Sequence, residues 1–174
     1  ELLVTDGPPP PTSIFKEVDG RSLVRDYSRD GVLKSLESSL SRLMVDHIDI
    51  LYIHDAYRER ADKAISEAFP ALDELRSSGV IKAIGVGMDD TAILTRFARE
   101  CDVDCFLTFS SYSFFNTTAL DELFPLCEKK GISIIQGSPF ESGILASDLS
   151  GEQKYRYHSA PDEVLEKARD IELI

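Results

Sequence analysis

The sequence is short of cysteine, of positive charge and of long apolar runs, and each shortage excludes a class of protein. Its 174 residues include only three cysteines. Their spacing matches neither a metal site nor a CxxC motif, so we expect no bound metal and no disulfide. Reduced thiols are typical of the cytoplasm, where we expect the protein to work. The three are Cys101, Cys105 and Cys127.

Positive charge is scarce as well. The 19 Lys and Arg residues face 31 Asp and Glu residues, and the net charge of −12 argues against a nucleic-acid or anionic-membrane partner. No apolar run approaches the ~20 residues that cross a bilayer, and no basic start precedes an apolar stretch. With 43% hydrophobic residues the chain can bury one core, so we predict a single domain over residues 1–174.

Residues 26–55 carry the most informative pattern, a helix that leads into a short apolar strand. Ser28 is the predicted N-cap of the helix. Residues 48–53 are nearly all apolar, as expected of a strand covered on both faces. His54 follows at the carboxyl end of the strand, where α/β enzymes place their chemistry. By position alone, a structural and a functional histidine are equally good interpretations. The apolar stripe of the helix consists of Val32, Leu36, Leu40 and Leu43.

The rest of the chain alternates helices with strands. A polar loop is predicted at residues 56–63, and after it a helix with Pro70 in its first turn and Gly79 at its end. Asp89 or Asp90 caps the next helix. The predicted strands that follow the first one cover residues 82–86, 103–109 and 132–135.

Four other segments have recognisable patterns. A helix that includes Leu120 ends at Gly131. Residues 7–11 predict a stiff polyproline connector. The segment 140–160 is too long for a simple turn, and it is either a lid or an ordinary surface insertion. A last helix begins near Pro161.

Strands that alternate with helices are expected to be parallel, because each crossover returns the chain to the same end of the sheet. A doubly wound sheet and a barrel both fit this rhythm. The first strand lacks the glycine-rich fingerprint of a dinucleotide-binding fold. A barrel needs eight strands and about 250 residues, and this chain has about half of that. We therefore expect a fragment of a domain, truncated at both ends.

Three motifs in the same order resemble one known family. Residues 46–54, with residues 39–43 before them, resemble the fourth-strand signature of the aldo-keto reductases, and residues 79–88 and 138–145 match later segments. The resemblance implies an α/β fold, the (β/α)8 TIM barrel, of which this chain carries about four strand-helix units. It also implies hydride transfer between NAD or NADP and a small-molecule substrate, a sugar or an aldehyde.

The resemblance assigns His54 to a catalytic tetrad of Asp, Tyr, Lys and His. In the family this histidine lies beside the carbonyl oxygen and orients the substrate by hydrogen bonding, a role suited to imidazole. The other three members lie on earlier strands, upstream of this chain. Tyr52, Lys63 and Lys82 are therefore interpreted as wall or surface residues.

The resemblance also implies the cofactor contacts. Ser138, Phe140 and Ser142 match positions of the segment that wraps the pyrophosphate, where hydroxyls and backbone amides donate hydrogen bonds. Many members have Ser-Asn after the fifth strand to hold the carboxamide, and here Gly87 and Met88 take that place. The Gly-Met pattern resembles the branch that oxidises aldoses at the anomeric carbon and the related pyridoxal 4-dehydrogenases.

Three departures from the family leave an alternative open, and the first is Gly87 and Met88 in place of Ser-Asn. Phe109 stands where many members have Gln, three residues before Tyr112, and Gly137 stands where a Tyr stacks on the nicotinamide. The first interpretation is that the protein is an enzyme, an aldo-keto reductase similar to the aldose 1-dehydrogenases. The alternative is a noncatalytic relative that binds a nucleotide or a partner protein. A phosphate-binding barrel isomerase would have the same alternation of strands and helices, but the residues around His54 do not match it. The oligomeric state and the choice between NAD and NADP stay open.

Overall fold

The structure is a computed structural model, and it describes residues 2–6, 21–156 and 158–173. The predicted polyproline connector at residues 7–11 lies outside these ranges. The strands are β1 (Leu2–Asp6), β2 (Arg21–Arg25), β3 (Ile50–His54), β4 (Ala83–Met88), β5 (Cys105–Phe109), β6 (Ser133–Gly137), β7 (Lys154–Tyr155) and β8 (His158–Ser159). The α-helices are α1 (Arg29–Leu43), α2 (Glu59–Lys63), α3 (Phe69–Ser77), α4 (Thr91–Glu100), α5 (Leu123–Lys130) and α6 (Asp162–Glu172). The other helical turns are the π-turn η1 (Ala64–Ala68) and the 3-10 turns η2 (Thr118–Leu120) and η3 (Glu141–Ala146).

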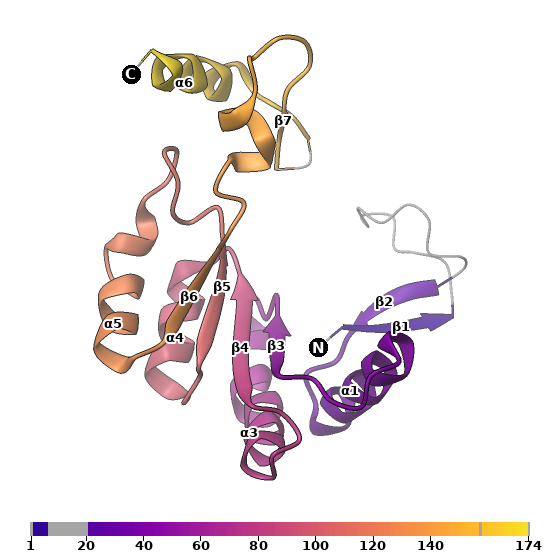
Figure 1. The fold of residues 1–174 in the computed structure, drawn as a ribbon. Coiled ribbons are helices and arrows are strands. Elements are labelled where there is room, and N and C mark those ends of the chain that lie inside the picture. Colours follow the sequence, from indigo (N-terminus) through magenta and orange to yellow (C-terminus); the bar gives the residue numbers. More distant parts are fainter. Residues whose placement is uncertain (1, 7–20, 157, 174) are drawn as a thin grey trace.

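Four strands form one parallel sheet in the order β3-β4-β5-β6, and a helical segment precedes each of them (Figure 1). The register pairs His54 with Gly87, and Phe109 with Gly137. Because the strands are parallel, their carboxyl ends lie at one edge of the sheet. The predicted parallel pairing and the four predicted units are confirmed. The antiparallel pairing of β1 with β2 was not predicted from the sequence.

Helix α1 begins as predicted and is less buried than predicted. The Ser28 hydroxyl accepts a hydrogen bond from the backbone N–H of Gly31, at 3.1 Å, which fixes the first turn. Val32 and Leu36 are buried, whereas Leu43 is exposed in the last turn. The predicted apolar stripe is therefore buried along its first half, half-buried at Leu40 and exposed at its end.

The predicted polar loop at residues 56–63 is wrong at its end, since α2 begins at Glu59 and continues through η1 into α3. Pro70 lies in the first turn of α3, as predicted, although α3 itself continues the helical run that begins at Glu59. Pro70 has no backbone N–H to donate, and the run widens to a π-turn just before it, where the N–H of Phe69 bonds to the carbonyl of Ala64. A stripe of small buried residues explains the packing of this run. These residues are Ala61, Ala64, Ala68 and Ala71.

The core lies between one face of the sheet and helices α3, α4 and α5 (Figure 1). Side chains alternate along a strand, so one set points to the helices. The buried set on the strands comprises Ile53, Ile84, Val86, Met88 and Phe106. We call the other face the open face, defined by Ile50, Leu107 and Ile135, each about 40% exposed. The prediction that residues 48–53 form a strand covered on both faces is therefore wrong for the side that carries Ile50, because the described helices of the core pack on the opposite face of the sheet.

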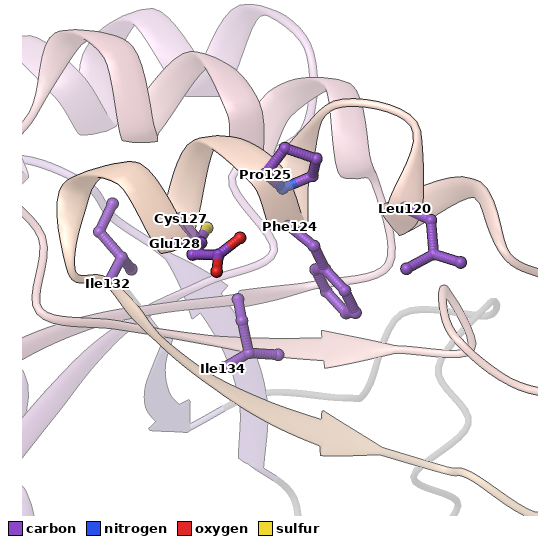
Figure 2. Close-up of a pocket in the computed structure, with 7 residues that line it drawn as sticks. All are labelled: Leu120, Phe124, Pro125, Cys127, Glu128, Ile132 and Ile134. Atoms are coloured by element: carbon purple, nitrogen blue, oxygen red, sulfur yellow. The ribbon is translucent and has the colours of Figure 1, made fainter.

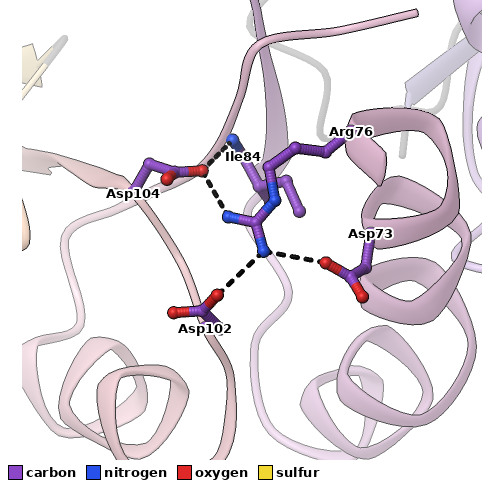
Figure 3. Close-up of polar contacts among 5 residues, drawn as sticks. All are labelled: Asp73, Arg76, Ile84, Asp102 and Asp104. Atoms are coloured by element: carbon purple, nitrogen blue, oxygen red, sulfur yellow. Dashed lines mark hydrogen bonds and ion pairs between the residues drawn. The ribbon is translucent and has the colours of Figure 1, made fainter. Parts of the chain in front are cut away.

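A charged network joins three elements at the amino ends of the strands (Figure 3). Arg76 in α3 donates to Asp104, at 2.7 Å, and to Asp73 and Asp102. Asp104 also accepts from the backbone N–H of Ile84 at 2.7 Å. Burial alone lowers the pKa of Arg76, but the hydrogen bonds to Asp73 and Asp104 outweigh this and raise it. The guanidinium therefore stays charged and ties α3 to β4 and β5.

The chain beyond β6 lies past the carboxyl ends of the strands (Figure 1). The segment predicted as a lid or insertion contains η3 and the short β7-β8 ladder, and α6 begins at Asp162, close to the predicted start. Leu120 lies in η2, before α5, rather than in α5 itself. Among the described residues, no helix is long and apolar enough to cross a membrane.

Candidate functional site

His54 ends β3 with its side chain 54% exposed at the carboxyl edge of the sheet. The neighbouring strand β4 has glycine at positions 85 and 87, so it carries no side chain there. A side chain at Gly85 would put its Cβ 2.3 Å from the Tyr52 ring, so this position requires glycine. A Cβ at Gly87 would lie 3.9 Å from Cδ2 of His54. Gly85 therefore leaves room for Tyr52 on the open face, whereas a side chain at Gly87 would make only an ordinary contact with His54.

The backbone at His54 is held by a buried tyrosine. The Tyr27 hydroxyl lies 2.7 Å from the carbonyl oxygen of His54 and 2.9 Å from that of Asp55, and it donates to this pair. The N–H of Asp55 donates to the carbonyl of Gly87 at 3.0 Å. Asp55 has a left-handed backbone, with φ of 52°, which costs about 1 kcal/mol or more for a residue with a Cβ. These contacts hold the strand end in place.

Charged groups surround the imidazole on one side. Oδ2 of Asp55 lies 3.7 Å from Nδ1 of His54 and 3.4 Å from the Arg25 guanidinium. The first distance exceeds that of a hydrogen bond, so the contact is electrostatic. The carboxylate of Asp55 therefore faces two groups that can each carry a positive charge, and Nε2 of His54 is left free of this contact.

A second carboxylate lies at the end of the next strand. The Tyr57 hydroxyl donates to Oδ1 of Asp89 at 2.7 Å. Burial, the hydrogen bond to Asp89 and the charges of Asp55 and Asp89 raise the pKa of Tyr57 well above its usual value. Tyr57 therefore stays neutral and acts as a donor. The strand ends of β3 and β4 thus present carboxylate oxygens that can accept hydrogen bonds from a polyhydroxylated ligand.

The turn after β6 collects the other predicted residues. Ser138 and Ser142 have left-handed backbones, with φ of 53° and 62°, and the side chain of Phe140 is exposed. The Ser138 hydroxyl accepts from the N–H of Ser142 at 3.4 Å, and the Ser142 hydroxyl accepts from the N–H of Arg156 at 2.9 Å. Within the described part of the chain neither hydroxyl donates, so both can donate to an anionic oxygen.

Met88 is placed differently. Its side chain is 3% exposed and lies in the core with Ile84 and Val86, on the helix side of β4. His54 and Gly87 lie on the opposite side of the sheet. A ligand at the strand ends can therefore reach the backbone of Met88 more readily than its side chain, and a cofactor contact from Met88 stays a prediction.

The residues left out of the site have partners elsewhere. The Tyr52 hydroxyl contacts Sγ of Cys105 at 3.3 Å, and burial is the main cause that raises its pKa to about 12. Lys82 pairs with Asp49 at 2.5 Å on the surface. These contacts agree with their interpretation as wall and surface residues. Lys63 is likewise in an ion pair, with Asp26 at 3.9 Å.

Several site residues were not singled out from the sequence. Asp55 follows His54 directly, and its place after a strand end was a usable signal. No signal in the sequence pointed to Arg25 or Tyr27, because their positions near residues 54 and 55 depend on how the chain after β2 folds back. None pointed to Glu141 or Arg156 either, since a single Glu or Arg in a polar segment is usually solvated.

An apolar groove of about 430 Å³ lies between α5 and β6 (Figure 2). The side chains of Phe124 and Ile134 point into it, on the helix side of the sheet and away from the open face. Burial raises the pKa of the Cys127 thiol beside it to about 11, so this thiol is a poor nucleophile. The groove therefore adds no chemistry to the site at the strand ends. Its lining residues are Leu120, Phe124, Pro125, Cys127, Glu128, Ile132 and Ile134.

Comparison with known proteins agrees with this geometry. The sequence profile of the Aldo/keto reductase family matches residues 17–172. The chain belongs to this family. It is 38% identical over 143 residues to a D-threo-aldose 1-dehydrogenase from Pseudomonas sp, covering 82% of the chain and 44% of that relative. It is 39% identical over 157 residues to a pyridoxal 4-dehydrogenase from Microbacterium luteolum, covering 85% of the chain and 46% of that relative.

Solved structures support the fold. An aldo-keto reductase from Bacillus halodurans, in its holo form, matches with a TM-score of 0.67 and 24% identity, over 84% of this chain and 48% of that one. A glycerol dehydrogenase from Gluconobacter oxydans matches with a TM-score of 0.65 and 20% identity, over 93% and 44%. The family fold is the TIM barrel, so the predicted fold class is confirmed: the chain is part of that barrel. It spans less than half the length of these curated relatives.

Proposed function

We propose that the protein containing this chain is a NAD- or NADP-dependent oxidoreductase that interconverts a carbonyl and an alcohol, with an aldose or a small aldehyde as substrate. Membership of the aldo-keto reductase family supports this, as do relatives named for aldose and pyridoxal oxidation. The observation that carries the proposal is the position of His54. Its imidazole stands exposed at the carboxyl edge of the sheet, beside Asp55 and above Gly87.

We assign His54 the role of a substrate-orienting group. An imidazole at this edge can hydrogen-bond to the reacting oxygen through Nε2, while Nδ1 faces the carboxylate of Asp55 at 3.7 Å. The Tyr27 hydroxyl fixes the backbone of His54, which limits how far the ring can move. A group positioned in this way favours one orientation of the substrate over others.

The turn after β6 is the proposed site for the pyrophosphate of the cofactor. The hydroxyls of Ser138 and Ser142 are available to donate, and Phe140 exposes a ring beside them. Two neutral hydroxyls on a left-handed turn fit an anionic group better than the carboxylate-rich ends of β3 and β4 do. When bound, the nicotinamide ring supplies or accepts the hydride. Met88 follows Gly87 on the adjacent strand, and its proposed contact with the cofactor is through the backbone.

The substrate preference follows from Asp55 and Asp89. Their carboxylate oxygens accept hydrogen bonds, and the Tyr57 hydroxyl is already committed to Asp89. A ligand with several hydroxyls can donate to the acceptor positions that Arg25 and Tyr57 leave open on these carboxylates, whereas a purely apolar aldehyde cannot. This favours an aldose. We also propose that the chain is part of one barrel domain and that the protein works in the cytoplasm, where its three free cysteines stay reduced.

The test uses the full-length protein. Binding of NAD⁺ and NADP⁺ is measured by fluorescence titration, and aldoses, pyridoxal and short aldehydes are then screened for a change in reduced-nicotinamide absorbance. We expect binding of at least one dinucleotide and turnover of an aldose. Failure to bind either dinucleotide would refute the proposal.

The second candidate is a dinucleotide-binding protein without turnover. Gly137 favours it, because this strand end carries no side chain that could stack on a nicotinamide ring. Binding without turnover of any substrate in the screen would support this candidate against the first.

A further inference from the structure

Glu141 is a buried acid for which the proposed reaction has no use. Its side chain is 0% exposed, and it is the only carboxylate among the fully buried residues that the structure describes. A buried carboxylate is unfavourable unless hydrogen bonds or charges compensate for its lost hydration. Such a residue in the middle of a polar turn needs an explanation.

The carboxylate joins two loops that follow neighbouring strands. Oε1 of Glu141 accepts a hydrogen bond of 2.5 Å from the Ser113 hydroxyl, in the loop after β5. That hydroxyl is fixed in turn, because it accepts from the N–H of Phe115 at 3.1 Å. The loop is closed further by Asn116, whose side-chain amide donates to the carbonyl of Ser110 at 2.8 Å. Glu141 is therefore hydrogen-bonded to a loop that is itself closed by internal hydrogen bonds.

The turn that Glu141 fastens is strained. Ser138, Glu141 and Ser142 all have positive φ, a conformation that residues with a Cβ rarely adopt. The turn has local hydrogen bonds, with the N–H of Glu141 donating to the carbonyl of Ser138 at 3.0 Å and the N–H of Gly143 donating to the carbonyl of Phe140 at 3.0 Å, but these bonds do not tie it to the loop after β5. Side chains alternate across the turn, so that Glu141 is buried while Phe140 and Ser142 are exposed. A buried link on one side thus sets the positions of the exposed groups on the other.

We propose that Glu141 is a positioning residue, a buried latch that holds the turn of residues 138–142 on the loop of residues 110–116 in the shape that binds the dinucleotide. The inference rests on the proposed function for the identity of the ligand. Its second oxygen, Oε2, is buried with no hydrogen-bond partner in the described part of the chain, as are the hydroxyls of Ser110 and Ser111. The latch is therefore held by a single strong bond and is sensitive to the loss of either partner.

The experiment compares Glu141→Ala, Glu141→Gln, Ser113→Ala and the double variant Glu141→Ala/Ser113→Ala in the full-length protein. Glu141→Ala and Ser113→Ala should each weaken dinucleotide binding about tenfold, as for a lost hydrogen bond to a charged group. The double variant should be no weaker than Glu141→Ala, because both changes break one link. Glu141→Gln keeps an acceptor for Ser113 and should restore most of the affinity. Turnover at saturating dinucleotide should stay within about threefold, since the turn acts on binding.

Hydrogen exchange separates the latch from a merely structural role. Amides of residues 138–146 should exchange faster in Glu141→Ala and in Ser113→Ala, while those of the β4 core keep their wild-type rates. An exposed glutamate on α5 gives the matched control, and Glu128→Ala should behave as wild type. Unchanged exchange in the turn, or unchanged affinity with a lower melting temperature alone, would overturn the proposal. If wild type binds neither NAD⁺ nor NADP⁺, the proposed function fails, and the exchange rates still decide whether the latch exists.

Discussion

Removing the guanidinium of Arg76 should destabilise the protein more than removing any comparable surface arginine. Arg76 is 18% exposed and bonds to three carboxylates. The contact with Asp102 adds little, because that side chain is 92% exposed and its charge is screened by water. The bond to Asp104 counts most, since Asp104 also accepts from the N–H of Ile84 and so holds the start of β4.

These contacts set the magnitude. Arg76→Met keeps the alkyl packing but loses one well-placed charge-assisted bond and one weaker one, and it leaves three carboxylates near one another. We expect the free energy of unfolding to fall by about 2 kcal/mol. Arg96→Met is the matched control, because Arg96 bonds to the carboxylates of Asp62 and Glu100 but is 41% exposed, against 18% for Arg76. Arg96→Met should lower the free energy of unfolding by about 0.5 kcal/mol or less.

The assay is urea unfolding of the full-length protein, followed by far-UV circular dichroism, for wild type and both variants. If Arg76→Met lowers the free energy of unfolding no more than Arg96→Met does, the reasoning is refuted. That result would mean that partial burial and the shared bond to the strand do not strengthen the network (Figure 3).

Three further predictions concern the site and the surface. His54→Gln should lower turnover roughly a hundredfold with little change in dinucleotide affinity, and equal steady-state turnover would remove His54 from the chemistry. Replacing Ser138 and Ser142 together by Ala should weaken dinucleotide binding by about 1 to 3 kcal/mol in a fluorescence titration, and an unchanged affinity would place the pyrophosphate elsewhere. The hydrogen bond and the charge of Asp46 raise the pKa of His47 above 6.5. Their stabilisation is therefore complete below pH 6.5 and disappears as the pH rises through the raised pKa, and an NMR titration midpoint at or below 6.5 would contradict this.

Local signals in the sequence predicted much of the fold. Ser28 and Asp90 cap helices as expected, with hydroxyl or carboxylate oxygens accepting from N–H groups three residues later. Gly79 and Gly131 adopt positive φ at helix ends, as glycine at those positions predicts. Such signals are readable because each depends on a few neighbouring residues.

The errors come from contacts that are distant in sequence. Helix α2, over residues 59–63, was predicted as part of a loop because its residues are polar apart from the buried Ala61. Leu43 has the spacing of a buried residue, yet its exposure depends on what packs against the last turn of α1. The pairing of β1 with β2 joins segments separated by a stretch whose composition gave no sign of it.

The site was predictable in the same uneven way. The strand end at His54 and the shared turn of Ser138 and Ser142 followed from motifs that are continuous in sequence. The approach of Arg25 to Asp55 and the link from Ser113 to Glu141 each span about 30 residues, and single-chain patterns carry no information on such pairs. Met88 shows the opposite case, a motif residue whose side chain the fold buries in the core.

Direct transfer of the substrate hydrogen tests the central claim most directly. The full-length protein is incubated with NAD⁺ or NADP⁺ and a panel of aldoses deuterated at the anomeric carbon, and the reduced nucleotide is analysed by mass spectrometry. The account predicts a reduced nucleotide that carries the deuterium from the sugar, formed far more slowly by His54→Gln and at the wild-type rate by Arg96→Met. Bound dinucleotide that is never reduced, or reduced nucleotide without deuterium, would contradict it.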